Sequence, residues 1–197
     1  MSSAVCLVVG AAGGFANGWL VSALRIHPLI VTLATSAAFR GLAEGLSQGA
    51  SYSQFGESFS QLGRGMWWGV PIAAYVFALL AVACAAYLAV TPGGRFLYAM
   101  GHNEQAARFS GVGVDRIKLR LYTFSGLMAG LAAIIYVSRF DTAKADAGTG
   151  FELDVITAVV VGGTSIYGGR GNIVGTVLGL LLIHETQQFV GRQWQID

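Results

Sequence analysis

The chain has 197 residues, of which 54% are hydrophobic and only 11% are charged, and its formal net charge is +2. Soluble globular domains carry about 25% charged residues, because most of their surface faces water. The composition therefore excludes an ordinary soluble domain, and a net charge this small does not indicate a nucleic-acid-binding protein.

Charged residues are spaced unevenly along the chain. Three stretches of 24, 30 and 18 residues contain no charged side chain, and they end at Arg25, Arg95 and Arg139. A helix rises about 1.5 Å per residue, so roughly 20 apolar residues cross a hydrocarbon core of about 30 Å. The sequence thus predicts an integral membrane protein, an all-α bundle of transmembrane helices in the lipid bilayer.

The first two apolar segments are separated by a proline turn. The first predicted span covers residues 4–24 and ends at the turn 25–28, because proline lacks an amide donor and restricts the residue before it. The second segment covers residues 29–39 and is followed by Arg40 and Glu44, which could pair across one helical turn. A helix that leaves the membrane by residue 40 is equally compatible with this pattern.

A polar loop and a third span follow. Residues 48–65 are polar and rich in turn-forming residues, so we expect a loop. The third span covers residues 66–90 and opens with Trp67 and Trp68, whose rings suit the headgroup layer of a bilayer. Pro71 is expected in the first turn of this helix, where a missing amide is tolerated best.

The polar stretch 91–120 carries most of the basic residues found between spans. Its charged residues are Arg95, Arg108, Arg116, Lys118 and Arg120 against Glu104 and Asp115. Basic residues are not in excess in the other two polar loops, 48–65 and 139–153. Since cytoplasmic loops carry the excess of Lys and Arg, 91–120 and the turn 25–28 should face the cytoplasm, and the other two loops should face outward.

Short apolar pieces follow the span predicted at 121–138. Segments 155–169 and 171–184 are too short to cross comfortably as isolated straight helices, since fourteen residues make about 21 Å. Irregular backbone at membrane depth is tolerated where it is buried in protein or lines a cavity. We therefore expect short interrupted helices here, with a helix break at Gly162, Gly163, Gly168, Gly169 and Gly171.

The glycine-rich stretch VGGTSIYGGRGNIVGT, residues 161–176, admits several interpretations. A phosphate-binding P-loop is excluded because no glycine here is followed by lysine, and the spacing does not fit Gly-x-Gly-x-x-Gly either. Close packing of helices through Gly175 and Gly179 is one remaining interpretation. The other is a place along a transport pathway, where polar groups would meet a solute; they are Thr164, Ser165, Tyr167 and Asn172.

Neither histidines nor cysteines indicate a metal site. His184-Glu185 begins like the zinc-protease pattern His-Glu-x-x-His, but the second ligand position is Gln188, so a polar pair near a helix end is the better interpretation. Cys6 and Cys84 lie in apolar runs and are expected to be small buried hydrophobes rather than a disulfide or metal ligands. The sequence predicts no cofactor.

A short helix with a defined start and end is predicted within residues 101–119, GHNEQAARFSGVGVDRIKL. Asn103 can cap it by accepting a hydrogen bond from an amide two or three residues on, and Glu104 suits the positive end of the helix dipole. The helix should stop at Gly111 or Gly113. A solvated connector does not need this order of residues, whereas a short helix with a small apolar face suits docking into a groove of a partner protein.

These residues resemble the permease subunit of bacterial ABC importers for monosaccharides, the group that holds ribose, xylose, rhamnose and autoinducer-2 permeases. Three stretches carry the resemblance: GHNEQAARFSG at 101–111, AGTGFELD at 147–154 and GGTSIYGG at 162–169. Asn17-Gly18 and the run 27–33 also fit, so the resemblance covers most of the chain. Residues 136–146 and 184–194 resemble the rhamnose and autoinducer-2 branch more than the ribose branch.

The resemblance implies a helical subunit of the bacterial inner membrane, paired with a second permease that is identical or different. It would receive sugar from a periplasmic sugar-binding protein and be driven by a cytoplasmic ATPase. It also implies a coupling loop within 91–120, with these docking residues: Asn103, Glu104, Ala106, Ala107, Arg108, Gly111, Ile117 and Leu119. Asn17, Thr32 and Asp154 would join the four polar residues of the glycine-rich stretch along the translocation pathway.

Family members are usually much longer, so we expect residues 1–197 to be a partial permease domain, shortened at both ends. Such a fragment need not transport anything by itself. An ion-coupled secondary transporter is the alternative, but it needs acidic or polar ligands deep in its spans, and the charge-free stretches offer few. A membrane enzyme has only the incomplete His184-Glu185 motif in its favour. The resemblance implies that ATP is hydrolysed in a separate subunit.

Overall fold

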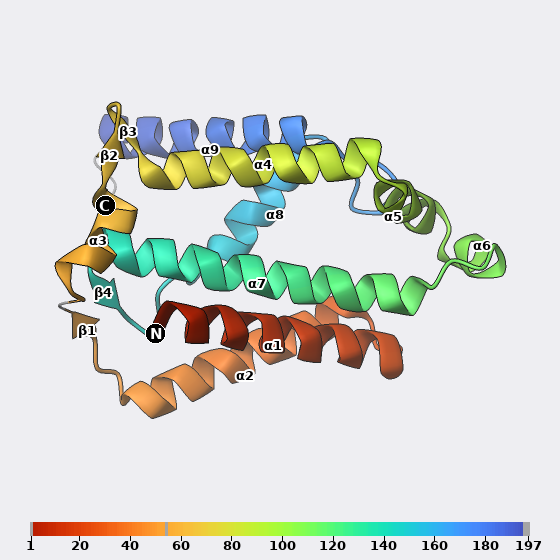
Figure 1. The fold of residues 1–197 in the computed structure, drawn as a ribbon, viewed down its shortest axis with the longest axis horizontal. Helices are drawn as coiled ribbons and strands as arrows, with labels where there is room; N and C mark the ends of the chain where they lie inside the picture. Colours follow the sequence, from red (N-terminus) through yellow and green to blue (C-terminus); the bar gives the residue numbers. More distant parts are fainter. Residues whose placement is uncertain (1, 54, 195–197) are drawn as a thin grey trace. The chain divides into compact units, whose positions relative to one another are not determined.

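The computed structural model describes residues 2–53 and 55–194. Contacts divide the chain into two compact units, the first formed by Met1–Val76 with Gly113–Ala147 and the second by Phe77–Val112 with Gly148–Asp197. Both units consist mainly of helices, and the strands are only two residues long (Figure 1). The all-α fold predicted from the sequence is confirmed.

Two long helices that pack closely together form the centre of the first unit. They are α1 (Ser2–Ala23) and α7 (Val114–Phe140). The helices run in opposite directions, since Gly10 lies against Gly126 while Gly18 lies against Leu119. A side chain at Gly10 or Gly14 would overlap a backbone carbonyl oxygen of α7. Small residues four apart thus let the two backbones approach closely, which is a common way for helices to associate in membranes.

The second helix, α2, spans Pro28–Ser47 and begins directly after the predicted proline turn. A ring nitrogen of His27 accepts a hydrogen bond of 3.4 Å from the amide of Leu29, and proline occupies the helix start, where its missing amide costs little. The helix runs without a break through Arg40 and Glu44. Among the described residues these two side chains form no ion pair, so the pairing that their spacing allows is not made.

The loop predicted at residues 48–65 contains two regular elements. They are β1 (Tyr52–Ser53), which pairs antiparallel with β4 (Thr142–Ala143), and α3 (Glu57–Arg64), which packs on α7. The prediction of a plain loop was wrong because contact with α7, which local composition does not reveal, stabilises α3. The pairing of β1 with β4 brings parts of the two loops that the charge pattern places on one side of the membrane, residues 52–53 and 142–143, together at one end of the first unit.

The third predicted span begins later than expected. Its elements are the antiparallel strands β2 (Met66–Trp67) and β3 (Val70–Pro71) and the helix α4 (Ile72–Val90). Trp68 and Gly69 form the turn with positive φ values of 53° and 78°, the geometry that two-residue hairpins favour. Pro71 therefore precedes the helix instead of lying in its first turn. The Tyr75 hydroxyl donates a hydrogen bond of 3.2 Å to the carbonyl of Trp67 and so ties the hairpin to α4.

The second unit contains most of α4 and four further helices. These are α5 (Pro92–His102), α6 (Glu104–Phe109), α8 (Phe151–Val161) and α9 (Ile173–Trp194). α8, with 11 residues, is the short interrupted helix that the sequence predicts. α9 continues for 22 residues through His184 and Glu185, so the prediction that residues 171–184 are too short to span was wrong. Polar residues with adequate helix propensity do not end a helix.

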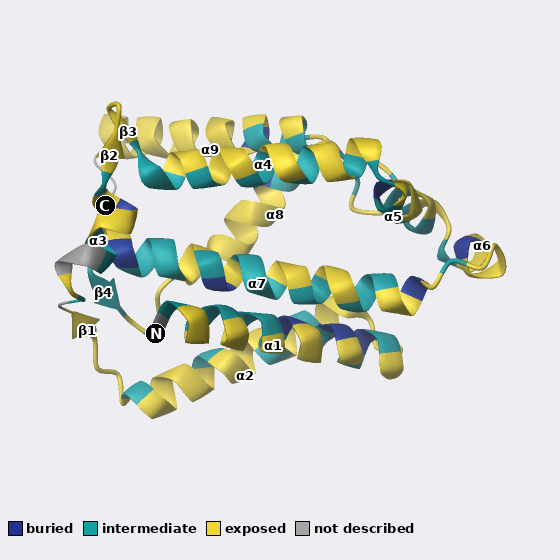
Figure 2. Ribbon diagram, in the orientation of Figure 1, coloured by how far each residue is buried: buried dark blue, intermediate teal, exposed yellow. Residues whose placement is uncertain are grey.

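The exposed surface of both units is rich in apolar side chains. Within the described part of the chain, five helices are long and apolar enough to cross a membrane, namely α1, α2, α4, α7 and α9. Most residues of α4 and α9 are exposed or half-buried, as Figure 2 shows. Exposing apolar surface to water costs roughly 25 cal/mol per Å², whereas lipid and neighbouring helices accept it. The predicted class, a polytopic membrane protein, is confirmed.

Candidate functional site

The short helix α6 begins at the predicted cap. The Asn103 side-chain oxygen accepts a hydrogen bond of 3.0 Å from the amide of Ala106, while the Asn103 amide donates one of 3.2 Å to the carbonyl of Ala99 in α5. One residue thus ends α5 and starts α6. The predicted cap is confirmed, and it fixes the angle at which α6 leaves α5.

The two faces of α6 differ sharply in exposure. Ala107 is only 6% exposed, whereas the ring of Phe109 is 92% exposed. Glu104 and Arg108 form an ion pair of 3.1 Å across one turn, which at this exposure is worth only about 0.3–0.5 kcal/mol. The helix ends at Phe109, and Gly111 follows with a φ of 82°, a conformation that favours glycine. α6 is therefore a short capped helix that exposes an aromatic ring.

The remaining predicted docking residues lie on another helix. Ile117 and Leu119 belong to the first turns of α7, in the first unit, whereas residues 103–111 belong to the second unit. The Leu119 side chain lies 3.2 Å from where a Cβ on Gly18 of α1 would sit, so it contributes to the packing of α1 against α7.

The glycine-rich stretch joins α8 to α9 as an ordered loop, residues 162–172, which we call the glycine loop. Positive φ values at Gly163, Gly168 and Gly169 give it a tight course that side chains would strain. Inside the loop, the Ser165 amide donates a hydrogen bond of 2.9 Å to the carbonyl of Arg170. The loop therefore holds its own shape without a bound group.

Residues of α5 contact the glycine loop directly. The Tyr98 hydroxyl donates a hydrogen bond of 2.9 Å to the carbonyl of Gly171. The backbones of Gly101 and Gly168 are so close that a Cβ on Gly168 would lie 2.7 Å from the carbonyl oxygen of Gly101. A Cβ on Gly169 would overlap the ring of His102. The end of α5 next to α6 and the glycine loop therefore form one contact surface.

The helices α8 and α9 form a closely packed antiparallel pair. A Cβ on Gly162 would lie 2.7 Å from the Cα of Thr176, and one on Gly179 would lie 2.9 Å from the amide nitrogen of Gly162. Gly175 likewise has no room for a side chain next to the backbone of Gly162. The predicted packing of helices through Gly175 and Gly179 is confirmed.

Predicted pathway residues of the second unit do not converge on one point. Thr164 packs against Gly171 inside the loop, Asn172 caps α9 by accepting a hydrogen bond of 3.0 Å from the amide of Val174, and Tyr167 is 97% exposed. Asp154 lies eight residues before the loop on α8, a rise of about 12 Å. Its carboxylate accepts a hydrogen bond of 3.2 Å from the side chain of Gln187 on α9.

Asn17 and Thr32 lie in the first unit and differ in how their polar atoms are satisfied. The Thr32 hydroxyl donates to the carbonyls of Pro28 and Leu29 at 3.1 and 3.2 Å, so it is bound within its own helix. The side-chain oxygen of Asn17 is buried and accepts no hydrogen bond from the described residues. A buried acceptor without a donor costs about 1–3 kcal/mol, which sets Asn17 apart from Thr32.

Comparison with known proteins identifies the family. The sequence model of a family described as the permease component of branched-chain amino acid transport systems matches residues 1–196. The chain belongs to this permease family. With five helices able to span among the described residues, the permease is a multi-pass protein of the inner membrane.

Similar proteins are bacterial import permeases. The permease is 44% identical over 169 residues to the ribose import permease protein of Bacillus subtilis strain 168, a match covering 85% of this chain and 52% of that protein. It is 40% identical over 184 residues to the ribose import permease protein of Escherichia coli K12, covering 91% and 57%. An autoinducer 2 import system permease protein of Photorhabdus luminescens is 36% identical over 188 residues, covering 92% and 56%.

The permease spans little more than half the length of these relatives. Of the three, the two ribose permeases show the higher identity, whereas residues 136–146 and 184–194 pointed to the autoinducer-2 and rhamnose branch. The family description names branched-chain amino acids instead, so membership alone does not define the cargo. No solved structure matches the chain.

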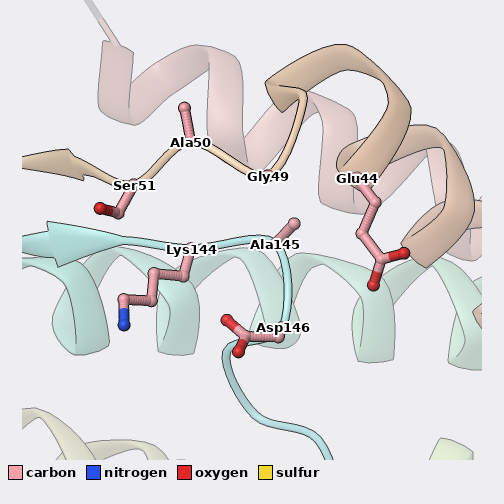
Figure 3. A pocket seen from close by; sticks show the side chains of 7 residues that line it. All are labelled: Glu44, Gly49, Ala50, Ser51, Lys144, Ala145 and Asp146. Carbon is pink, nitrogen blue, oxygen red and sulfur yellow. The ribbon is translucent and has the colours of Figure 1, made fainter.

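A shallow polar hollow of about 540 Å³ lies in the first unit of the permease, between the C-terminal end of α2 and the residues that follow β4 (Figure 3). It is lined by Glu44, Gly49, Ala50, Ser51, Lys144, Ala145 and Asp146. The charged side chains are exposed, so they remain hydrated. This hollow could not be predicted from the sequence, because residues 44–51 and 144–146 are brought together by the pairing of β1 with β4.

Side chains suited to metal binding are scattered through the described part of the permease, where no group of three or more His, Cys, Asp or Glu could hold an ion. His184 on α9 has Gln188 as its neighbour, 3.4 Å away. Cys6 is half-buried and its thiol donates to the carbonyl of Gly130 at 3.5 Å, in keeping with a packing role. The relatives are named as permeases and not as enzymes.

Proposed function

We propose that the chain is a membrane-spanning part of an ATP-driven importer for a sugar or a sugar-like solute. The observation that supports this most directly is α6, a capped helix of six residues whose Phe109 ring is unburied. A hydrated connector between α5 and α7 does not need a capped helix or an exposed aromatic ring. A helix that docks into a groove of a partner protein needs both. The names of the relatives, which include ribose and autoinducer-2 import, agree with the cargo class.

The partners follow from this function. α6 would dock into a cytoplasmic ATPase, which supplies the energy, because the sequence has no phosphate-binding glycine motif of its own. A periplasmic sugar-binding protein would deliver the solute at the end of the first unit that carries β1 and β4. A second permease, identical or different, would complete the pathway and cover part of the apolar surface.

The docking surface is best assigned to α6 and its flanks. Asn103 sets the angle of the helix, Ala107 anchors its inner face, and Gly111 allows the chain to turn away. Glu104, Ala106 and Arg108 would border the Phe109 ring. Ile117 and Leu119 would act indirectly, by setting where α7 begins relative to α1.

The pathway for the solute is assigned to Asn17 first. Its buried side-chain oxygen can accept a hydrogen bond from a sugar hydroxyl, whereas the Thr32 hydroxyl is already bound to its own helix. Asp154, Thr164, Ser165, Tyr167 and Asn172 remain proposed pathway residues with weaker support, since most of their polar groups serve the loop or the α8–α9 pair.

Uptake measurements in inverted and right-side-out membrane vesicles test this proposal. Right-side-out vesicles carrying the chain in its complete complex should take up labelled ribose or autoinducer-2 only when ATP is inside, and preloaded inverted vesicles should release the solute only when ATP is added outside. Collapsing proton and sodium gradients with ionophores should leave this uptake unchanged. Uptake that follows an ion gradient without ATP would instead establish the ion-coupled alternative.

A further inference from the structure

The helix α6 and the pair α8–α9 are far apart along the chain. α6 ends at Phe109, and α8 begins at Phe151, after the whole of α7 has intervened. A push on α6 that followed the backbone would have to pass through α7 first. The contact between α5 and the glycine loop offers a direct route, because α5 joins α6 at Asn103 and the loop joins α8 to α9.

This contact has two parts of different character. One is the hydrogen bond from the Tyr98 hydroxyl to the carbonyl of Gly171, which is directional and half-buried. The other is backbone against backbone, where Gly101 meets Gly168 and Gly169 with no side chain between them. Two helices that merely share a surface usually touch through flexible side chains, which absorb small displacements. Main-chain contact leaves little room for such absorption, because close-packed interiors transmit strain.

Each end of this contact is rigidly attached. On one side, the amide of Asn103 binds the carbonyl of Ala99, and its side chain caps α6. On the other side, Asn172 caps α9, while Gly162 lies against the backbone of Gly175. The contacts from α6 to the α8–α9 pair therefore run through main-chain contacts at Gly101 and Gly162 and through short side-chain caps at Asn103 and Asn172.

We propose that α5 and the glycine loop move as one body, with Tyr98 and Gly101 as the positioning residues that pass displacement of α6 to the α8–α9 pair. This inference rests on the proposed function, since it needs an ATPase that displaces α6. It gives the glycine-rich stretch a mechanical role, which does not depend on whether its polar residues also meet the solute. Neither residue needs to touch the solute or the ATPase.

Two substitutions break the contact in different ways. Tyr98→Phe removes the hydroxyl and keeps the ring, so the shape is unchanged while the bond to Gly171 is lost. Gly101→Ala adds a methyl group that overlaps the amide of Gly169, so the loop must move away. The matched controls are Tyr87→Phe, whose hydroxyl makes no hydrogen bond to the described residues, and Gly191→Ala on α9, where no described atom lies within 4 Å of the added methyl group.

The measurement is the number of solute molecules taken up per ATP hydrolysed, in proteoliposomes that contain the complete transport complex. ATP hydrolysis should persist in both variants, while uptake per ATP should fall by about threefold for Tyr98→Phe and about tenfold for Gly101→Ala. Both controls should match the unmodified complex. If Tyr98→Phe and Gly101→Ala keep the normal ratio, the inference is overturned while the proposed function stands. If the unmodified complex shows no ATP-dependent uptake, the proposed function fails, and the inference fails with it.

A cross-link tests the same inference through a recovery of uptake per ATP instead of a fall in it. In a background with Cys6→Ala and Cys84→Ala, the pair Tyr98→Cys and Gly171→Cys should be uncoupled, because the hydrogen bond is gone. Joining the two thiols with a short bifunctional reagent should restore uptake per ATP toward the unmodified ratio. A cross-link that abolishes the remaining uptake, or leaves the ratio low, would show that α5 and the glycine loop must separate during transport or do not transmit the motion.

Discussion

The Ser138 hydroxyl of α7 accepts a hydrogen bond of 2.7 Å from the amide of Gly63 in α3. The same hydroxyl donates to the carbonyl of Phe59, and the Ser138 side chain is 0% exposed. One buried side chain thus satisfies a donor and an acceptor of α3. The contact explains why a segment with little apolar character forms a helix at this position.

Replacing Ser138 with alanine should therefore destabilise the first unit. The buried amide of Gly63 and the half-buried carbonyl of Phe59 would lose this partner, and a buried unsatisfied group costs about 1–3 kcal/mol. The thermal midpoint of the protein in detergent, followed by circular dichroism, should fall clearly. Ser36→Ala is the control, because among the described residues the Ser36 hydroxyl binds the Leu33 carbonyl of its own exposed helix and no other group. Equal midpoints for the two variants would contradict the role assigned to Ser138.

Two glycines in helices of the same unit should respond in opposite ways to alanine. Gly14→Ala places a methyl group on a backbone carbonyl oxygen of α7, so α1 and α7 must move apart, at a cost of about 1–3 kcal/mol. At Gly41 no described atom lies within 4 Å of the added methyl group, so Gly41→Ala should stabilise α2 by up to about 1 kcal/mol. Thermal midpoints in detergent check both. A fall at Gly41 as large as that at Gly14 would mean that the close approach of α1 and α7 is not the cause.

Orientation in the membrane can be tested at the two ends of the first unit. β1 and β4 pair at one end, while at the other the Ser22 hydroxyl lies 3.4 Å from the carbonyl of Asp115 and donates to it. Because the basic stretch 91–120 should face the cytoplasm, a cysteine at Ser51 should react with a membrane-impermeant maleimide in intact cells. A cysteine at Gln105 should react only after permeabilisation. The reverse pattern would overturn both the orientation and the docking role of α6.

Local signals in the sequence predicted local structure well. The cap at Asn103 needs only an acceptor and the amide of Ala106, so three residues contain all the information. The proline turn before α2 is equally local. The end of α9 was predicted too early, at His184 and Glu185. The helix continues through both residues, because polar side chains do not by themselves end a helix.

Features that depend on distant contacts could not be predicted. Tyr98 and Gly171 are 73 residues apart, and Gly63 and Ser138 are 75 residues apart. In neither pair does the sequence around one residue indicate which distant residue it contacts. The glycine-rich stretch could be recognised as irregular, but its contact with α5 depends on how the second unit folds.

Asn17 offers a test of the solute pathway. Asn17→Ala removes a buried acceptor that the described residues leave without a donor, so stability should change little or improve. If a solute hydroxyl binds this oxygen, the half-saturating solute concentration for uptake should rise by about fivefold, since a hydrogen bond is worth roughly 1 kcal/mol. Thr32→Val is the comparison, because its hydroxyl is bound within α2. Unchanged saturation behaviour in Asn17→Ala would remove this residue from the pathway.

The Phe109 ring provides the most direct test of docking. Because the ring is 92% exposed, Phe109→Glu should leave the thermal midpoint of the isolated permease unchanged, whereas a change at Ala107 would disturb packing. An apolar groove would reject the carboxylate, since burying an unpaired charge is far more costly than burying a ring. Co-purification of the ATPase subunit with Phe109→Glu should therefore fall by about tenfold or more. Gln105→Glu adds the same charge one turn away on an exposed position and should have a smaller effect. If the two variants retain the ATPase equally, any loss of binding reflects the added charge and not the missing ring. The Phe109 ring is then not the docking contact.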